Sequence, residues 1–121
     1  MTSDVRRATD FVVVSTAVDG EATARALAAK IVEKRLAACV QHTAISSTYR
    51  WKGAIETADE YLLLCKTRAS LADALTEFIR RQHSYEIAEV LVTAVEDGIT
   101  DYLEWIYVET EQECLCENEE G

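Results

Sequence analysis

Segments with strand-like and helix-like patterns alternate along this chain in an order that few small folds accommodate. Short runs of β-branched and aromatic residues predict strands, whereas stretches whose apolar residues recur every three or four positions predict helices. The predicted strands cover residues 11–14, 37–51, 61–65 and 90–95, and the predicted helices cover 21–36, 71–82 and 101–106. The expected order is therefore β-α-β-β-α-β-α.

Local signals place the ends of these segments. Ser70, followed by Asp73 three residues later, predicts a capping box at the start of the second helix. Thr100 is the expected N-cap of the closing helix. We expect an irregularity of the second strand near Gln41-His42 and a polar break at residues 56–59, before the third strand.

This order predicts an α+β fold of the ferredoxin-like type, a split β-α-β sandwich (β-α-β-β-α-β) with an additional C-terminal helix. The antiparallel sheet of such a fold carries both main helices on one face and leaves the other face uncovered. Lys52-Gly53 supplies the turn of a long hairpin whose tip presents Tyr49, Arg50 and Trp51. Because aromatic and arginine side chains dominate interfaces, we expect an oligomer that buries the open face, with this tip as an intersubunit anchor.

Length and charge restrict the organisation further. The 121 residues suit one domain, which we assign to residues 11–110, with a disordered N-terminal segment at 1–10 and an acidic tail at 111–121. A formal net charge of −10 disfavours nucleic acid and anionic membranes as partners. No apolar run approaches the roughly 18 residues of a membrane span, and no secretory signal is recognisable, so we expect a cytoplasmic protein.

Several motifs occur in an order that resembles the CutA family of divalent-cation tolerance proteins. They are Leu36-Ala37-Ala38-Cys39-Val40, Tyr49-Arg50-Trp51-Lys52-Gly53, Leu64-Cys65-Lys66-Thr67, His83-Ser84-Tyr85-Glu86-Ile87-Ala88-Glu89, and Glu96-Asp97-Gly98 with Tyr102-Leu103-Glu104-Trp105. The resemblance covers about residues 11–109. It implies a homotrimer of ferredoxin-like subunits, similar in architecture to the PII signalling proteins, that is associated with tolerance to copper and other divalent cations.

The absence of proline is a departure from the family pattern. Val18, Ser84 and Ala88 stand where the family usually has proline. Because proline restricts φ and the conformation of the residue before it, we expect these loops to be less pre-organised here.

Candidate metal ligands follow the second helix. His83, Glu86 and Glu89 combine an imidazole with two carboxylates, a set that suits Cu²⁺ or, less well, Zn²⁺. Cys39 is a further candidate, as a soft copper ligand. The alternatives are structural: His83 caps the C-terminus of the helix, the carboxylates are solvated or paired, and Cys39 packs in the core.

We expect a ligand cleft around these residues, with Trp51, Lys66 and Tyr85 nearby. Lys66 would line an anion-tolerant pocket or form an ion pair. In the acidic tail, Cys114-x-Cys116 is either a weak soft-metal motif or part of a solvated segment.

No sequence motif pairs a nucleophile with a base, and no Gly-rich phosphate loop, HExxH or CxxC motif occurs. We therefore expect a non-enzymatic trimer that binds a divalent metal, copper or similar, takes part in divalent-cation tolerance and needs no cofactor for folding. One alternative is a PII-like sensor that binds a small anionic metabolite in clefts between subunits. A small hydrolase would rest on fold analogy alone.

Overall fold

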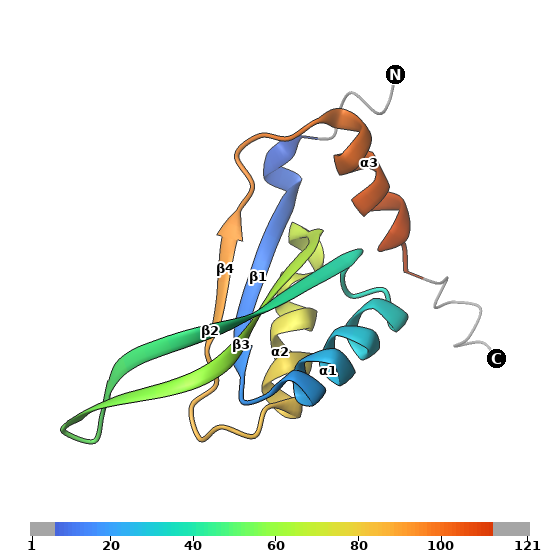
Figure 1. The fold of residues 1–121 in the computed structure, drawn as a ribbon. Coiled ribbons are helices and arrows are strands. Elements are labelled where there is room, and N and C mark those ends of the chain that lie inside the picture. Colours follow the sequence, from blue (N-terminus) through green and yellow to red (C-terminus); the bar gives the residue numbers. More distant parts are fainter. Residues whose placement is uncertain (1–6, 113–121) are drawn as a thin grey trace.

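A computed structural model describes residues 7–112 and contains a four-stranded sheet and three α-helices within that range (Figure 1). The strands are β1 (Phe11–Val18), β2 (Cys39–Trp51), β3 (Ala54–Arg68) and β4 (Val90–Ala94). The α-helices are α1 (Glu21–Glu33), α2 (Ala72–Gln82) and α3 (Thr100–Glu109), and the 3₁₀ helices are η2 (Ala8–Asp10) and η3 (Ala69–Leu71). None of the helices in this range is long and apolar enough to span a membrane.

The sheet is antiparallel with strand order β2-β3-β1-β4, so β1 lies between β3 and β4. Helices α1 and α2 lie against one face of this sheet (Figure 1). The predicted ferredoxin-like α+β class, with its split β-α-β order and added C-terminal helix, is confirmed.

The main core lies between this face and the two helices. Val12, Val14 and Val18 of β1 and Leu63 and Cys65 of β3 are buried in it. The buried helical residues of the same cluster are Ala24, Leu27, Ile31, Leu75, Phe78 and Ile79. Complete burial of each large aliphatic side chain stabilises the fold by about 1.5–3 kcal/mol. Burial also raises the pKa of the Cys65 thiol to about 12, with a smaller contribution from Cys39, so Cys65 remains protonated at neutral pH.

The hairpin is longer and more regular than predicted. β2 and β3 pair without interruption from Cys39 opposite Lys66 to Trp51 opposite Ala54. The irregularity expected near Gln41-His42 is absent, because both residues keep the antiparallel register. Residues 56–59, expected to form a break, are paired strand residues. These residues are polar because they are largely exposed, since this part of the hairpin extends past the end of β1.

Helix α1 ends at Glu33, three residues earlier than predicted. Arg35 adopts the left-handed conformation with φ 59, and its amide donates to the Val32 carbonyl while the amide of Leu36 donates to the Ile31 carbonyl. This pair of bonds is a Schellman motif, which normally has glycine at the left-handed position. Because arginine occupies that position, the sequence contains no glycine signal for the end of the helix.

The two predicted N-caps are not used. Ser70 lies within η3, so α2 begins after Leu71, and Thr100 is the first residue of α3, whose N-cap is Ile99. Neither Leu71 nor Ile99 makes a side-chain cap hydrogen bond. At α2 the chain already turns in η3, which includes Ser70, whereas at α3 the extended residue before the helix is Ile99, so Thr100 is already helical.

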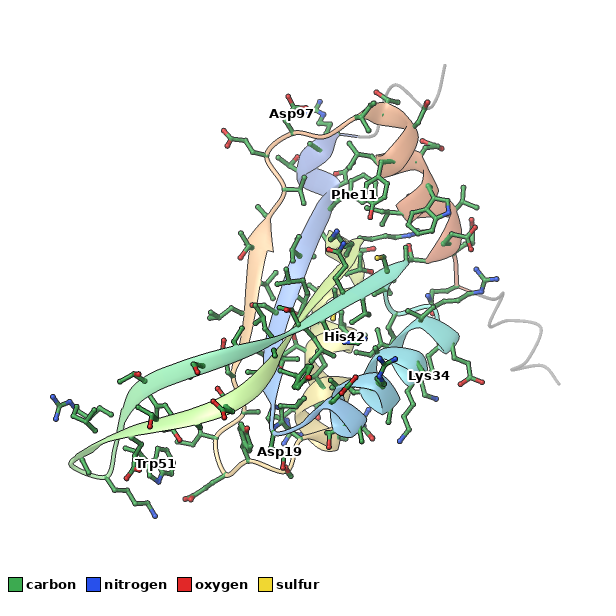
Figure 2. The ribbon with its side chains drawn as sticks, in the orientation of Figure 1. Phe11, Asp19, Lys34, His42, Trp51 and Asp97 are labelled. Atoms are coloured by element: carbon green, nitrogen blue, oxygen red, sulfur yellow. The ribbon has the colours of Figure 1, made fainter. Side chains whose placement is uncertain are left out.

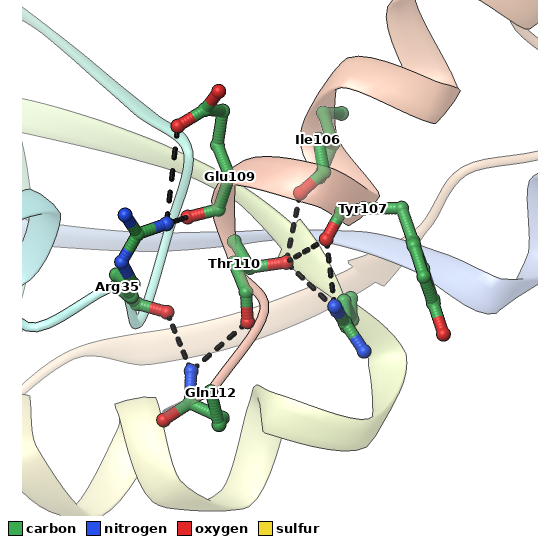
Figure 3. A network of polar contacts seen from close by, with 7 residues as sticks. Arg35, Ile106, Tyr107, Glu109, Thr110 and Gln112 are labelled. Atoms are coloured by element: carbon green, nitrogen blue, oxygen red, sulfur yellow. Dashed lines mark hydrogen bonds and ion pairs between the residues drawn. The ribbon is translucent and has the colours of Figure 1, made fainter. Parts of the chain in front are cut away.

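Polar contacts fix the C-terminal end of α3 (Figure 3). Arg68 donates from Nε to Thr110 Oγ1 (2.8 Å) and from Nη2 to the Tyr107 carbonyl (2.6 Å), and its guanidinium lies 3.7 Å from the centre of the Tyr107 ring. Arg35 Nη1 donates to the Glu109 carbonyl (3.1 Å). These contacts tie α3 to β3 and to the end of α1.

The structure describes a few residues on each side of the expected domain limits, 11 and 110. The last residues of the segment predicted to be disordered, 1–10, form η2, closed by a 2.9 Å bond from the Asp10 amide to the Arg7 carbonyl. In the segment 111–121, Gln112 Nε2 donates to the Arg35 carbonyl (3.0 Å). The rest of both segments, including Cys114 and Cys116, lies outside the described residues.

The second face of the sheet is only partly covered within the described chain. Since side chains alternate along a strand, Lys66 and Arg68 point to the face opposite the core residue Cys65. Both lie over rings of α3, Lys66 at 5.8 Å from the centre of Tyr102. Further along this face, apolar side chains that are half-buried or exposed lie among the polar side chains of Ser15, Gln41, Thr43 and Thr93. These apolar residues are Val13, Leu62, Leu64 and Leu91.

We expect Thr16→Val to stabilise the protein. Thr16 is fully buried in β1, and its Oγ1 has no hydrogen-bond partner among the described residues. Replacing an unpaired buried hydroxyl with a methyl group should raise the free energy of unfolding by about 1 kcal/mol and the thermal midpoint by about 4 °C. The matched control is Thr67→Val, because Thr67 Oγ1 donates to the Leu36 carbonyl (2.7 Å) and its removal should destabilise. Equal effects of the two substitutions in thermal unfolding would contradict this account.

We expect Arg68→Ala to detach the end of α3, at a cost of about 2–3 kcal/mol in denaturant unfolding, because it removes two charged-donor hydrogen bonds and a ring contact. Arg68→Lys keeps the positive charge but lacks the planar guanidinium group with its several donors. It should therefore recover only part of the lost stability. Arg25→Ala, which breaks the exposed Arg25–Glu21 pair within α1, is the control and should change stability little. A loss in Arg68→Ala no larger than in this control would refute the anchoring role.

Candidate functional site

The far part of the hairpin forms one wall of a cleft. β1 ends at Val18, opposite Tyr61, so residues 54–60 of β3 pair only with β2 and extend about 20 Å past the end of β1 (Figure 1). Alternate residues of a strand share a face, and Tyr49 and Trp51 of β2 both line the cleft. Figure 2 shows Trp51 near the end of the hairpin, on the same side of it as Asp19 at the end of β1.

The loop between α2 and β4, residues 83–89, forms the opposite wall. It leaves α2 at His83 and passes beside the hairpin before β4 begins at Val90 opposite Thr16. The cleft between the walls has a volume of about 710 Å³. Its lining residues are Asp19, Ser47, Thr48, Tyr49, Trp51, Ala58, Asp59, Glu60, Tyr85, Glu86, Ile87 and Glu89.

The lining is acidic and aromatic. It includes five carboxylates and three aromatic rings, whereas no lysine, arginine or histidine is among the described residues that line it. A cleft with one sign of charge raises the local concentration of counter-ions of the opposite sign. The site therefore favours a cation, and it disfavours the anionic guest of the alternative interpretation.

His83 has a structural role in one chain. Its Nε2 lies 2.8 Å from the Ala17 carbonyl, and its Nδ1 accepts a hydrogen bond from the Tyr85 amide (3.3 Å). Because a carbonyl can only accept, Nε2 is the donor in this contact, whereas Nδ1 is the acceptor. The ring also lies 4.7 Å from the Tyr85 ring, centre to centre. His83 occupies the C-cap position of α2, but its two ring nitrogens position the loop and do not bind the carbonyls of that helix, and metal binding would require breaking one of these contacts.

Tyr85 connects the loop to the hairpin. Its hydroxyl donates to Glu60 Oε2 (2.9 Å), and burial, followed by the hydrogen bond to Glu60, raises the pKa of Tyr85 well above its ordinary value. Tyr85 therefore stays neutral, and it holds the Glu60 carboxylate at the side of the cleft.

Lys52 reaches the mouth of the cleft from the hairpin turn. Its Nζ lies 3.9 Å from Glu86 Oε1 and 5.5 Å from the centre of the Trp51 ring. The side chains of Lys52 and Glu86 are both about 70% exposed, so this ion pair contributes little to stability. It does show that an ammonium group fits between the ring and the carboxylate.

The predicted site residues fall into separate groups. Trp51, Tyr85, Glu86 and Glu89 line the same cleft, whereas His83 lines a separate pocket beside α1. Cys39 and Lys66 pair with each other at the opposite end of the sheet, where Lys66 is six positions, or about 20 Å, from Glu60 along β3. Within residues 7–112, no three histidine, cysteine, aspartate or glutamate side chains are grouped closely enough to hold a metal ion.

Sequence reasoning missed Asp19, Asp59 and Glu60. The sequence alone predicts part of this arrangement. When both strands are counted outwards from the Lys52-Gly53 turn, residues 58–60 pair with residues 45–47 within the hairpin. The position of Asp19, Asp59 and Glu60 beside the loop depends on where β1 ends. The apolar pattern of β1 alone does not predict that end.

Curated relatives share most of this chain. It is 50% identical over 92 residues to Protein CutA of Mus musculus, a match that covers 75% of this chain and 52% of the relative. It is 42% identical over 99 residues to the divalent-cation tolerance protein CutA of Escherichia coli, covering 81% of this chain and 88% of the relative. The chain thus spans about half the length of the mouse relative and most of the bacterial one.

Comparison with solved structures and family models agrees with these relatives. CutA from Synechococcus elongatus has a TM-score of 0.84 and 35% identity, covering 88% of this chain and 95% of that one. CutA1 from Oryza sativa has a TM-score of 0.81 and 38% identity, covering 85% and 95%. The family model described as CutA1 divalent ion tolerance protein matches residues 12–109. The chain therefore belongs to the CutA1 family of divalent ion tolerance proteins.

Proposed function

We propose that this chain is a non-enzymatic, cytoplasmic homotrimer that binds a divalent metal ion and takes part in divalent-cation tolerance. The observation that carries the proposal is the family match across residues 12–109, together with the name of the Escherichia coli relative. Two features support a non-enzymatic role. His83 has both ring nitrogens engaged, and Cys65 lies in the main core with a pKa near 12, so neither is a free base or nucleophile.

The uncovered sheet face supports an oligomer. Leu62 and Leu64 are only half-buried on this face, and Leu91 is 60% exposed. Contiguous exposed apolar side chains mark interaction surfaces. A closed trimer with PII-like architecture would bury them and would bring the clefts of neighbouring chains next to other subunits.

Copper is the proposed ion, with zinc less favoured. Glu86 and Glu89 supply oxygen ligands from the loop, but one chain does not group a third ligand with them in its described part. The proposal therefore requires a ligand from a second copy. Cys39 is a candidate, because it is half-exposed and would provide the soft thiolate that favours copper.

The alternative, a PII-like sensor of an anionic metabolite, has less support. An anion needs positive partners, and Lys66 lies over Tyr102 at the other end of the sheet from the acidic cleft. Titration with a panel of nucleotides tests this alternative alongside the metals.

We expect light scattering to give a molar mass of about three times 13.5 kDa at micromolar concentration. Leu64→Glu places a charge on the uncovered face and should shift the protein towards monomers. Ala29→Glu, on the exposed side of α1, is the matched control and should leave the assembly unchanged. A monomeric parent protein would refute the trimer.

We expect calorimetric titration to show Cu²⁺ binding that Glu86→Gln, Glu89→Gln and Cys39→Ser each weaken by about tenfold or more, because each removes one ligand. All proteins carry Cys114→Ser and Cys116→Ser, so that the tail thiols do not contribute. Glu96→Gln, a carboxylate outside the cleft, is the control. Equal Cu²⁺ affinity in all variants would place the metal elsewhere and contradict the proposed site.

A further inference from the structure

We propose that the cleft between the β2–β3 hairpin and the 83–89 loop binds an aliphatic polyamine, whose ammonium groups are held by carboxylates and aromatic rings. The inference concerns the cleft of the proposed function, but it does not depend on metal binding. It rests on the position of Lys52, on the spacing of the carboxylates and on the arrangement of the rings.

The protein's own Lys52 indicates what the cleft recognises. Its ammonium group simultaneously approaches the Trp51 ring (5.5 Å to the centre) and Glu86 Oε1 (3.9 Å). A cation over an aromatic face with a carboxylate beside it is a common arrangement for organic ammonium groups. Lys52 thus acts as an internal ligand at the mouth of the cleft.

This internal ligand is weakly held. Lys52 and Glu86 are largely exposed, and their separation of 3.9 Å is at the limit of an ion pair. Lys52 lies in the turn, where its φ of 50 and the φ of 85 at Gly53 define the backbone. The turn requires a left-handed backbone at this position rather than an ammonium group. An external amine with several charges can therefore displace Lys52 without disturbing the hairpin.

The carboxylates come from three different segments of the cleft wall and do not converge on one point. Asp19 follows β1, Asp59 and Glu60 lie on β3, and Glu86 and Glu89 lie on the loop. No three of the acidic, histidine or cysteine side chains described in residues 7–112 converge closely enough for a metal ion. Charges distributed in this way match a chain with separated positive groups better than a single compact ion.

The aromatic residues complete the match. Tyr49 and Trp51 are alternate residues of β2, and Tyr85 faces them from the loop, with its hydroxyl directed to Glu60. The methylene segments of a polyamine can pack on these rings while its ammonium groups contact the carboxylates. The cleft volume of about 710 Å³ lies within the range of about 300–1,000 Å³ typical of small-molecule sites.

The test is calorimetric titration of the full-length protein with spermidine, a linear triamine, in metal-free buffer containing a chelator. We expect saturable binding that weakens about tenfold in Glu86→Gln and in Trp51→Leu, and less in Trp51→Tyr, which keeps a ring. Lys52→Gln should bind spermidine about threefold more tightly, because it removes both the competing ammonium and a positive charge. A purely structural role of Lys52 would not produce tighter binding.

Glu96→Gln is the matched control, since it removes one negative charge outside the cleft. If it weakens binding as much as Glu86→Gln does, diffuse attraction by the net charge explains the result and the site is overturned. Unchanged or weaker binding by Lys52→Gln also overturns it, as does binding of an oligolysine peptide without binding of spermidine. Titration with Cu²⁺ in amine-free buffer tests the proposed metal binding separately. The metal proposal and the polyamine proposal can therefore fail independently.

Discussion

The uninterrupted pairing of β2 with β3 is the constraint on which both the core and the cleft depend. The register runs from Cys39 opposite Lys66 to Trp51 opposite Ala54, and the positive φ values of Lys52 and Gly53 close it with a two-residue turn. A slip of one residue would reverse the faces of every side chain on the shifted strand. It would take Leu63 and Cys65 out of the main core or turn the aromatic residues of β2 away from the cleft. The core therefore fixes the register, and the register orients the projecting part of the hairpin that no other strand supports.

The 83–89 loop is held against β1 and the hairpin by hydrogen bonds rather than by restricted backbone dihedrals. Ser84 and Ala88 lack the ring that proline would provide, so the loop has more conformations available in the unfolded chain. His83 offsets this freedom, because its two ring nitrogens contact the Ala17 carbonyl and the Tyr85 amide. These two contacts, together with the Tyr85–Glu60 hydrogen bond, order the loop in place of proline.

The sequence predicted the order of elements well, because that order follows from hydrophobic periodicity and turn residues. Errors arose where local patterns compete with tertiary structure. Residues 56–59 are strand residues without an apolar side, since they lie past the end of β1. The end of α1 depends on Arg35 in a left-handed conformation, for which the arginine side chain gives no signal. The loop carboxylates were found because they follow a recognisable motif. Asp19 and Glu60 were not, because only the folded sheet brings them beside that loop.

The distribution of charge in the cleft links ligand binding to the stability of the fold. Its carboxylates come from three segments that are far apart in the sequence, so they repel one another only when the chain folds. Lys52 offsets part of this repulsion, but from an exposed position that solvent screens. A cation that binds the folded chain relieves the rest and stabilises it by mass action, whereas the unfolded chain presents no such arrangement. The Tyr85–Glu60 hydrogen bond already holds the loop against the hairpin in the chain alone, so a bound cation would add to a contact that the fold itself makes.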